Sequence, residues 1–368
     1  MKSREKGNVN IFLGILIIIV CVAIGYMLIN SGESENVNVA TNFTTERETV
    51  TRNLNTTTPT AKAETNVELS SDILNGGSSS NQSTSTTSTG EGYYYKQLTS
   101  EGKRMYNLIS SNINALKSGT GSINFDINEA NLDQYFQSTW DAISLDKPEL
   151  FYVSTENISL LTRTTSSIFG KVTYSYILQP QSGTTYFKKA WNSENEVSTA
   201  IQQVDNKVNQ IVSQAPQTNR YDKIKYAHDY LINNMEYNQQ DAVNNGDVYG
   251  ALIKGTAVCE GYAKAFQLLM NKLNVPSVIV FGKGVDDQGN EEFHAWNYVQ
   301  MEDGTWYAVD TTWDDPIVIG KGKIPDSTKT RYFLKGSNDF FKQHTEDPDV
   351  SGTGQKFVYP ILSTTNYR

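Results

Sequence analysis

The chain has 368 residues, of which 38% are hydrophobic and 11% aromatic, so it is long enough for two domains with cores of their own. Its formal net charge of -9 at pH 7 and its pI near 5.0 argue against a nucleic-acid partner, because a phosphate-binding surface needs clustered Lys and Arg. Outside the first six residues the sequence has no such cluster.

An apolar run near the N-terminus predicts a membrane anchor. Residues 11–29 form 19 consecutive residues without a charge, enough to cross about 30 Å of hydrocarbon as a helix. Lys2, Arg4 and Lys6 precede this run, and the positive-inside rule keeps their basic tail, residues 1–10, in the cytoplasm. The rest of the chain is then extracellular. A cleaved signal peptide is the alternative, although its apolar region is usually shorter, about 7–15 residues.

Residues 30–90 are predicted to be a disordered tether. Between Ser31 and Gly90, 24 of 60 residues are Ser or Thr, and Phe43 is the only aromatic residue. Such a segment cannot bury enough apolar surface to offset the loss of chain entropy on folding. We expect the tether to set the reach from the membrane and to take no part in chemistry.

Residues 91–215 are expected to form a small α+β domain. Apolar residues at helical spacing predict three helices, over residues 97–116, 132–143 and 192–212. Two stretches rich in β-branched and aromatic residues predict strands, over residues 149–154 and 171–178. The region has no cluster of Cys, His and carboxylate side chains. Two roles are therefore compatible with the sequence of this domain: it could cover the catalytic unit, or it could hold a substrate.

Residues 216–368 are expected to form the catalytic domain, which begins with a helix over residues 218–238. His228 lies inside the apolar stripe of that helix. A buried histidine that is hydrogen-bonded to a neighbour is the simpler interpretation of His228, against a catalytic role.

Cys259 is the candidate nucleophile. The other cysteine, Cys21, lies in the apolar run, so we expect no disulfide. Gly255 breaks the chain, and Thr256 is a suitable N-cap for an amphipathic helix that holds Cys259 in its first turn. The unpaired N–H groups and the positive end of the helix dipole favour a thiolate there. The backbone N–H of Cys259 can also bind the oxyanion of an acyl-transfer intermediate.

Two strands after this helix bring an imidazole and a carboxylate together. A buried strand over residues 274–284 is followed by EEFHAWNYVQ and TWYAVDTTW, which are joined by Glu302, Asp303 and Gly304. A three-residue hairpin loop puts His294 and Asp310 on one face of the sheet as diagonal neighbours. A two-residue Asp-Gly turn would put them on opposite faces. A catalytic pair therefore requires the longer loop or a bulge.

A thiol, an imidazole and a carboxylate in this arrangement predict thiol-dependent acyl transfer. Asp310 would accept the imidazole N–H and fix its tautomer, His294 would take the thiol proton, and Cys259 would attack a carbonyl group. The imidazole would later return a proton to the leaving amine.

The stretches that carry these residues resemble the transglutaminase-like superfamily, particularly its bacterial extracellular branch. The matching segments are HDYLINNMEYN, GTAVCEGYAKAFQLLMNKLNVPSVIV and HAWNYVQMEDGTWYAVDTTWDDP, and more weakly YFLKGSNDFFKQHTED. The strong match runs from Tyr226 to Pro316. The resemblance implies Cys259 as nucleophile, His294 as base and Asp310 as its orienter. It also implies an α+β, papain-like fold, with the Cys helix packed on an antiparallel sheet.

The residues around Cys259 depart from the pattern Gly-Gln-Cys-Trp of vertebrate-type transglutaminases, since Ala257, Val258 and Glu260 surround it. The favoured function is cross-linking of Gln side chains to primary amines in surface proteins or cell-wall peptides. Because the same triad can use water as acceptor, a cysteine peptidase or amidase is one alternative. A non-catalytic wall-binding scaffold is the other.

Several further residues have a functional and a structural interpretation. Trp296 and Trp313 are candidate walls of a narrow acyl or Lys channel, or else core tryptophans. Asp314 and Asp315 are too few ligands for calcium and are interpreted as turn residues. His344 has no assigned partner and is interpreted as structural. We expect no cofactor and no metal.

Overall fold

A computed structural model describes residues 44–51, 92–125, 127–166, 170–240, 244–315, 325–350 and 356–368. All of them belong to one compact unit. The predicted cytoplasmic tail and anchor, residues 1–29, lie outside the described residues, as does most of the predicted tether. Within the part that is described, no helix combines the length and the apolar character needed to cross a membrane.

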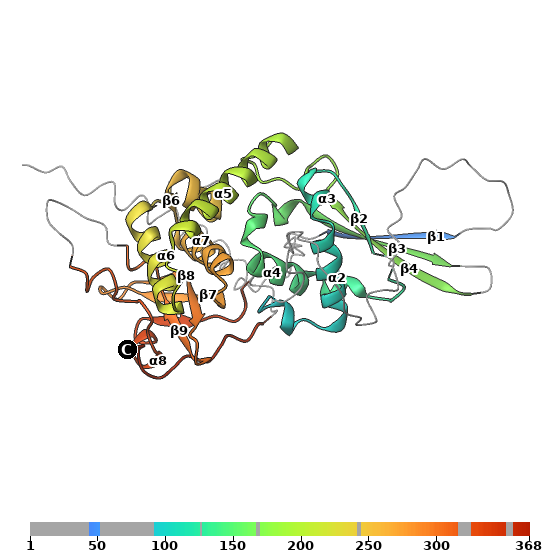
Figure 1. Ribbon diagram of the computed structural model, residues 1–368. Helices are drawn as coiled ribbons and strands as arrows, with labels where there is room; N and C mark the ends of the chain where they lie inside the picture. The colour runs from blue at the N-terminus through green and yellow to red at the C-terminus, as the bar shows by residue number, and fades with distance from the viewer. Residues whose placement is uncertain are drawn as a thin grey trace, which may run out of the picture. The chain divides into compact units, whose positions relative to one another are not determined.

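The first sheet has four strands in the order β1-β3-β4-β2 (Figure 1). They are β1 (Thr44–Thr51), β2 (Ile123–Phe125), β3 (Ile158–Ser166) and β4 (Val172–Pro180). β1 pairs in parallel with β3, so the prediction of disorder throughout the tether is wrong for this segment. The Thr-rich sequence of β1 suits a strand, and the edge of β3 offers unpaired backbone groups.

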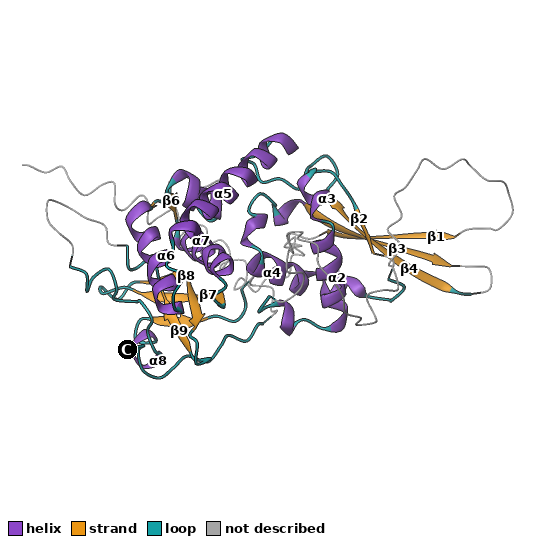
Figure 2. Ribbon diagram, in the orientation of Figure 1, coloured by secondary structure: helices purple, strands orange, loops and turns teal. Residues whose placement is uncertain are grey.

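Four α-helices accompany this sheet in the sequence (Figure 2). They are α2 (Ser100–Ser111), α3 (Ile113–Lys117), α4 (Phe136–Asp146) and α5 (Glu194–Gln214). The helix predicted over residues 97–116 is broken at Asn112, and the helix predicted over 192–212 is confirmed as α5. The strand predicted over 149–154 is wrong. Pro148 starts a 3-10 turn there, and a short apolar run does not by itself distinguish strand from turn.

The second sheet carries the candidate site, and its strand order is β10-β7-β8-β9. Its strands are β7 (Ser277–Val285), β8 (Glu291–Gln300), β9 (Trp306–Val309) and β10 (His344–Glu346). All neighbouring strands in it are antiparallel. The register expected for the three-residue loop is confirmed, because Asn297 pairs with Val309 and Tyr298 with Ala308. Gly304 takes the left-handed conformation that this loop requires, with φ of +85°.

Helix α7 (Cys259–Leu273) packs on this sheet through β7 and β8. Helices α5 and α6 (Arg220–Asn234) also contact α7. Its buried face includes Tyr262, Phe266 and Leu269, which are among the residues that fix the helix on the sheet. The buried amide of Asn297 donates from β8 to the Ala263 carbonyl of α7 at 3.1 Å. The fold is therefore α+β, with the Cys helix on an antiparallel sheet as predicted.

The N-cap predicted for α7 is wrong. Thr256 lies in β6 (Thr256–Ala257), which pairs in parallel with β5 (Glu236–Tyr237), and α7 begins at Cys259 after Val258, whose side chain makes no cap hydrogen bond. The backbone of Thr256 is engaged in a strand and cannot cap the helix. Cys259 consequently lies at the first helical position, closer to the end of the helix than predicted.

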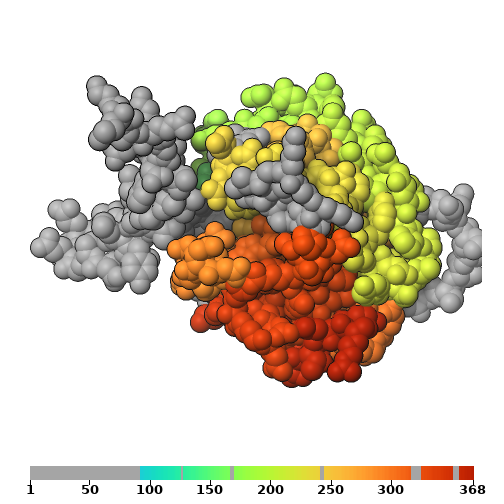
Figure 3. Space-filling model, turned by 90° about the vertical axis from the view of Figure 1, so that its left-hand side faces the viewer, coloured from blue at the N-terminus to red at the C-terminus, as the bar shows by residue number. Residues whose placement is uncertain are grey.

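Contacts join the two regions that the sequence predicts as domains. Lys188 forms an ion pair at 3.0 Å with the buried carboxylate of Asp247, and the Tyr94 hydroxyl donates to the Ile279 carbonyl on β7. The predicted boundary at residue 215 stays a prediction. On the face shown in Figure 3, yellow residues adjoin orange and red residues of the C-terminal part. Lys329 of the C-terminal part donates to Asn233 of α6. The remaining helix is α8 (Ser337–Phe340).

Candidate active site

Cys259 and His294 face each other across the junction of helix and sheet. Cys259 is the first residue of α7 and is partly exposed, whereas His294 of β8 is 1% exposed. A hydrogen bond with Cys259 contributes to the raised pKa of His294. Because Nε2 of His294 is bonded to Asp310, Nδ1 is the ring nitrogen left for the thiol. The predicted nucleophile and base are therefore close enough for the thiol to affect the pKa of the imidazole.

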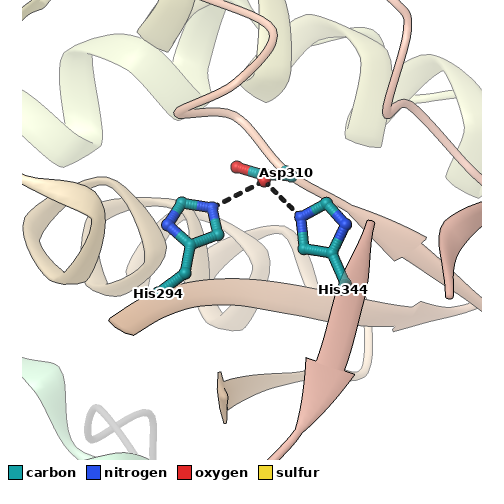
Figure 4. A group of neighbouring side chains, drawn as sticks. All are labelled: His294, Asp310 and His344. Carbon is teal, nitrogen blue, oxygen red and sulfur yellow. Dashed lines mark hydrogen bonds and ion pairs between the residues drawn. The ribbon is translucent and has the colours of Figure 1, made fainter. Parts of the chain in front are cut away.

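Asp310 holds the other side of the His294 ring, as Figure 4 shows. Its Oδ2 atom lies 2.7 Å from Nε2 of His294, and the Asp310 side chain is fully buried. Its Oδ1 atom accepts the backbone N–H groups of Thr312 at 3.0 Å and of Trp313 at 3.1 Å. The turn that follows β9 therefore fixes the carboxylate in a single orientation.

The protonation states follow from these contacts. Burial alone lowers the pKa of His294, but the charge and hydrogen bond of Asp310 and the contact with Cys259 outweigh burial and raise that pKa to about 10. Burial raises the pKa of Asp310, yet the neighbouring His294 and the hydrogen bonds of both histidines lower it below its ordinary range. The pair is therefore an imidazolium and a carboxylate at neutral pH.

His344 is a residue of the site that sequence reasoning missed. Its Nε2 atom lies 3.0 Å from the same Oδ2 atom of Asp310, a partner that the sequence did not assign. Its strand, β10, lies at the opposite edge of the sheet from β9, and strand order is not readable from sequence spacing. The weak match of the segment YFLKGSNDFFKQHTED is the one sequence signal that pointed to it.

Two glycines on β7 make room for this arrangement. Gly282 pairs with His294 and Gly284 with His344, so all four residues lie on one face of the sheet. A Cβ atom on Gly284 would lie 2.6 Å from the ring of Trp313, and one on Gly282 would lie 2.0 Å from the backbone oxygen of Thr345. Larger residues at either position would push the rings or β10 away.

The two predicted channel tryptophans have different surroundings. Trp313 is partly exposed, stacks on His294 at 4.9 Å between ring centroids, and lines a cleft of about 600 Å³. Trp296 is 1% exposed and packs against Phe340 and His344, so its assignment as a channel wall is wrong. Trp296 is therefore a core residue next to His294.

The cleft beside Trp313 has an acidic lining, and we call it the acidic cleft. Its carboxylates are Asp286, Asp287, Glu292 and Asp315. Arg331 also lines it and is paired with Asp287 at 2.7 Å. Tyr237 lines the same cleft, and burial raises its pKa to about 12, with a smaller contribution from Cys259. A smaller cavity of about 160 Å³, near Lys207 and Tyr230, has none of these candidate catalytic residues in its lining.

Asp314 and Asp315 lie in the turn that follows β9, as predicted, and their side chains also contact residues outside that turn. Asp314 is fully buried and accepts from the Tyr332 backbone N–H at 2.8 Å, while its other oxygen lies 3.0 Å from His228. Asp315 accepts the hydroxyl hydrogen of Tyr262. The prediction of a buried, hydrogen-bonded His228 is confirmed.

The group of His294, Asp310 and His344 also has the composition of a metal site, since its ligand atoms lie within 4.8 Å of one another. A tetrahedral zinc ion would hold neighbouring ligand atoms roughly 3.3 Å apart. The separation of 2.7 Å between His294 and Asp310 is that of a direct hydrogen bond. The arrangement is therefore that of a hydrogen-bonded trio.

Comparison with known families agrees with this geometry. Residues 206–311 match the profile of the Transglutaminase-like superfamily, and this stretch holds Cys259, His294 and Asp310. The chain therefore contains a transglutaminase-like core.

Among solved structures, the chain is similar to a transglutaminase at 14% identity and a TM-score of 0.27, over 61% of this chain and 62% of that one. It is also similar to a candidate cysteine protease from Cytophaga hutchinsonii at 13% identity and a TM-score of 0.26, over 39% and 54%. The periplasmic domain of TgpA from Pseudomonas aeruginosa matches at 15% identity and a TM-score of 0.18, over 39% and 55%. The chain spans less than two thirds of each of these proteins. No curated protein matches it.

Proposed function

We propose that the protein is a thiol-dependent acyltransferase of transglutaminase type, in which Cys259 is the nucleophile, His294 the general base and acid, and Asp310 its orienter. The observation that carries the proposal is the chain of contacts from the thiol through the imidazole to a fixed, ionised carboxylate. This is the arrangement that activates a thiol and later protonates a leaving amine. An intact chain of this kind also argues against a non-catalytic scaffold.

In the first half-reaction, the Cys259 thiol has given its proton to His294, and the resulting thiolate attacks the carboxamide carbon of a Gln side chain. The carbonyl electron pair moves onto oxygen, where the backbone N–H of Cys259 is one donor and the Tyr237 hydroxyl, in the adjoining cleft, is a second candidate. When the tetrahedral intermediate collapses, the C–N bond breaks and His294 gives its proton to the leaving group, which departs as ammonia. The product is a thioester on Cys259.

In the second half-reaction, a primary amine attacks the thioester carbon and forms an amide bond, while His294 takes the proton of the amine and the Cys259 sulfur leaves. The acidic cleft favours an amine over water, because its carboxylates attract a cationic acceptor. Burial raises the pKa of Asp315 to about 6, so this group is still mostly charged at neutral pH.

We also propose that residues 11–29 anchor the enzyme in the membrane, with the catalytic unit outside. Surface proteins or cell-wall peptides with Gln and amine groups would then be the substrates. The uncharged run and the basic residues before it support this topology. Protease treatment of intact cells tests it, since degradation of the C-terminal part is expected and its protection would contradict the proposal.

The activity is tested with the full-length protein, a Gln-bearing acceptor protein and a labelled primary amine. We expect label in the acceptor protein and release of ammonia, both of which Cys259→Ala should abolish. Ammonia or peptide fragments without label would instead identify the water-using amidase or peptidase of the same fold. Label that persists in Cys259→Ala, or no Cys259-dependent product of any kind, would contradict the proposal.

A further inference from the structure

We infer that His344 is a positioning residue for the proposed reaction: its ring N–H holds the Asp310 carboxylate, charged and correctly aimed, behind His294. The inference rests on the proposed function. It concerns a residue that lies outside the matched segment 206–311 and is not itself part of the lining of the acidic cleft.

The first line of evidence is convergence on one oxygen atom. Nε2 of His294 and Nε2 of His344 lie 2.7 Å and 3.0 Å from Oδ2 of Asp310 (Figure 4). With the N–H groups of Thr312 and Trp313 on Oδ1, the buried carboxylate has four donors. His294 is the one donor of the four that gives away a proton in the reaction.

Because His294 loses a proton during the reaction, Asp310 needs a second donor that does not. When His294 protonates the leaving group, Asp310 loses the charge that balances it, although its side chain is fully buried. A buried carboxylate without compensation is strongly destabilised, and it would be drawn toward protonation or rotation. A second imidazole N–H on the same oxygen keeps the carboxylate solvated through that step and ready for the return of the proton.

His344 suits this task because it is a donor that stays neutral. Burial lowers its pKa and the charge of His294 lowers it further, while Asp310 and the backbone of Phe340 oppose these effects without reversing the shift. A neutral imidazole that donates from Nε2 leaves the negative charge of Asp310 available to His294.

The ring of His344 is held by aromatic side chains. Phe340 stacks on it at 3.9 Å between ring centroids and 14° between planes, and Trp313 and Trp296 lie at 4.5 Å and 5.0 Å. Gly282 lets the backbone of β10 approach β7, because a Cβ there would meet Thr345 at 2.0 Å. The ring is therefore fixed in direction, as a positioning residue requires.

Two variants separate the N–H group from the ring. His344→Phe keeps the aromatic packing and loses the donor, whereas His344→Gln loses the ring and keeps an N–H group near the position of Nε2. We expect His344→Phe to lower kcat for amine incorporation about tenfold or more with KM unchanged, and His344→Gln to recover most of that loss. Equal kcat for wild type and His344→Phe, or a greater loss in His344→Gln than in His344→Phe, would overturn the inference.

A measurement on the wild-type protein covers the case in which a variant fails to fold. The sequence has three histidines, so nitrogen-15 labelling of histidine gives three imidazoles to resolve by NMR. We expect the His344 ring to show a protonated Nε2, an unprotonated Nδ1 and no titration between about pH 6 and 8. The opposite tautomer, or titration near its ordinary pKa, would overturn the inference. Absence of all Cys259-dependent products would by contrast count against the proposed function, whatever the NMR result.

Discussion

His294 and His228 each contact a buried aspartate in the same half of the chain, and only the contact of His294 has the features of an active site. In both, Nε2 of the histidine meets an aspartate oxygen, at 2.7 Å for His294–Asp310 and 3.0 Å for His228–Asp314. All four side chains are almost fully buried, and the pKa of each histidine is raised above its ordinary value. Burial and pairing are therefore common to both contacts.

The difference lies in what else each partner touches. The second nitrogen of His228 is bonded to Asp229, whereas that of His294 is left for the Cys259 thiol beside an open cleft. Asp310 has hydrogen bonds from two peptide N–H groups and two imidazoles, and its pKa falls. Asp314 has one of each, and burial raises its pKa to about 6. The charge of His294 and the hydrogen bonds of both histidines lower the pKa of Asp310, whereas the charge of Asp310 adds to the effect of burial at Asp314. Access to a thiol distinguishes the function of the two contacts.

The largest expected effect is that of Cys259→Ala. We expect acyl transfer to fall by a factor of about 10³ or more, because no other thiol lies in the described residues to form the thioester. The free energy of unfolding should change little, since Cys259 is partly exposed at the end of a helix. Activity assays and thermal unfolding of the same preparations check both statements. Unchanged activity in Cys259→Ala would contradict the assignment of His294, and not His228, to an active site.

The next effect is that of Asp310→Asn. An amide cannot balance the His294 imidazolium, so we expect kcat to fall by roughly 10²–10⁴-fold, as for triads in general. The matched variant on the other contact, Asp314→Asn, should leave kcat within about threefold of wild type. Equal losses of kcat in the two variants would contradict the assignment of the catalytic aspartate.

Asp314→Asn should instead act on stability. It alters a fully buried contact that ties α6 to the turn after β9 and to the turn that holds Tyr332. Loss of one partner from a buried pair typically costs about 3 kcal/mol of unfolding free energy. Denaturant unfolding at pH 7 measures this quantity. A change below about 1 kcal/mol would show that the second contact has little structural role.

A further effect is expected from pH. The folded-state pKa of His294 is raised to about 10, above the ordinary value of about 6.5, so its contribution to stability is complete below pH 6.5 and is lost as the pH rises toward 10. The slope from this group is at most about 1.4 kcal/mol per pH unit. Asp310→Asn should flatten the curve of unfolding free energy between these pH values. An identical slope in wild type and variant would contradict the raised pKa of His294.

Local sequence signals predicted what lies close together in the chain. The three-residue loop at Glu302–Gly304 predicted the register of β8 and β9, and with it the shared face of His294 and Asp310. The apolar stripe of residues 262–273 predicted α7, and that of α6 predicted the burial of His228. These features depend on hairpin geometry and helical periodicity, which act over a few residues.

Features that depend on distant contacts were not predicted. His344 reaches Asp310 because β10 pairs with β7 at the far edge of the sheet. Trp296 is a core residue because Phe340 of α8 packs against it. Asp314 contacts His228, which is 86 residues away in the sequence. Thr256 does not cap α7 because it lies in β6, which pairs with β5. In each case tertiary contacts overrode the local preference.

The central claim is that Cys259 forms a thioester, and mass spectrometry of the intact full-length protein with a Gln-bearing peptide tests it most directly. Without an added amine, we predict an adduct of the peptide mass less ammonia, located on Cys259 by digestion, released by hydroxylamine and absent from Cys259→Ala. Release of product with an adduct on another residue, or equal product from wild type and Cys259→Ala, would contradict the claim.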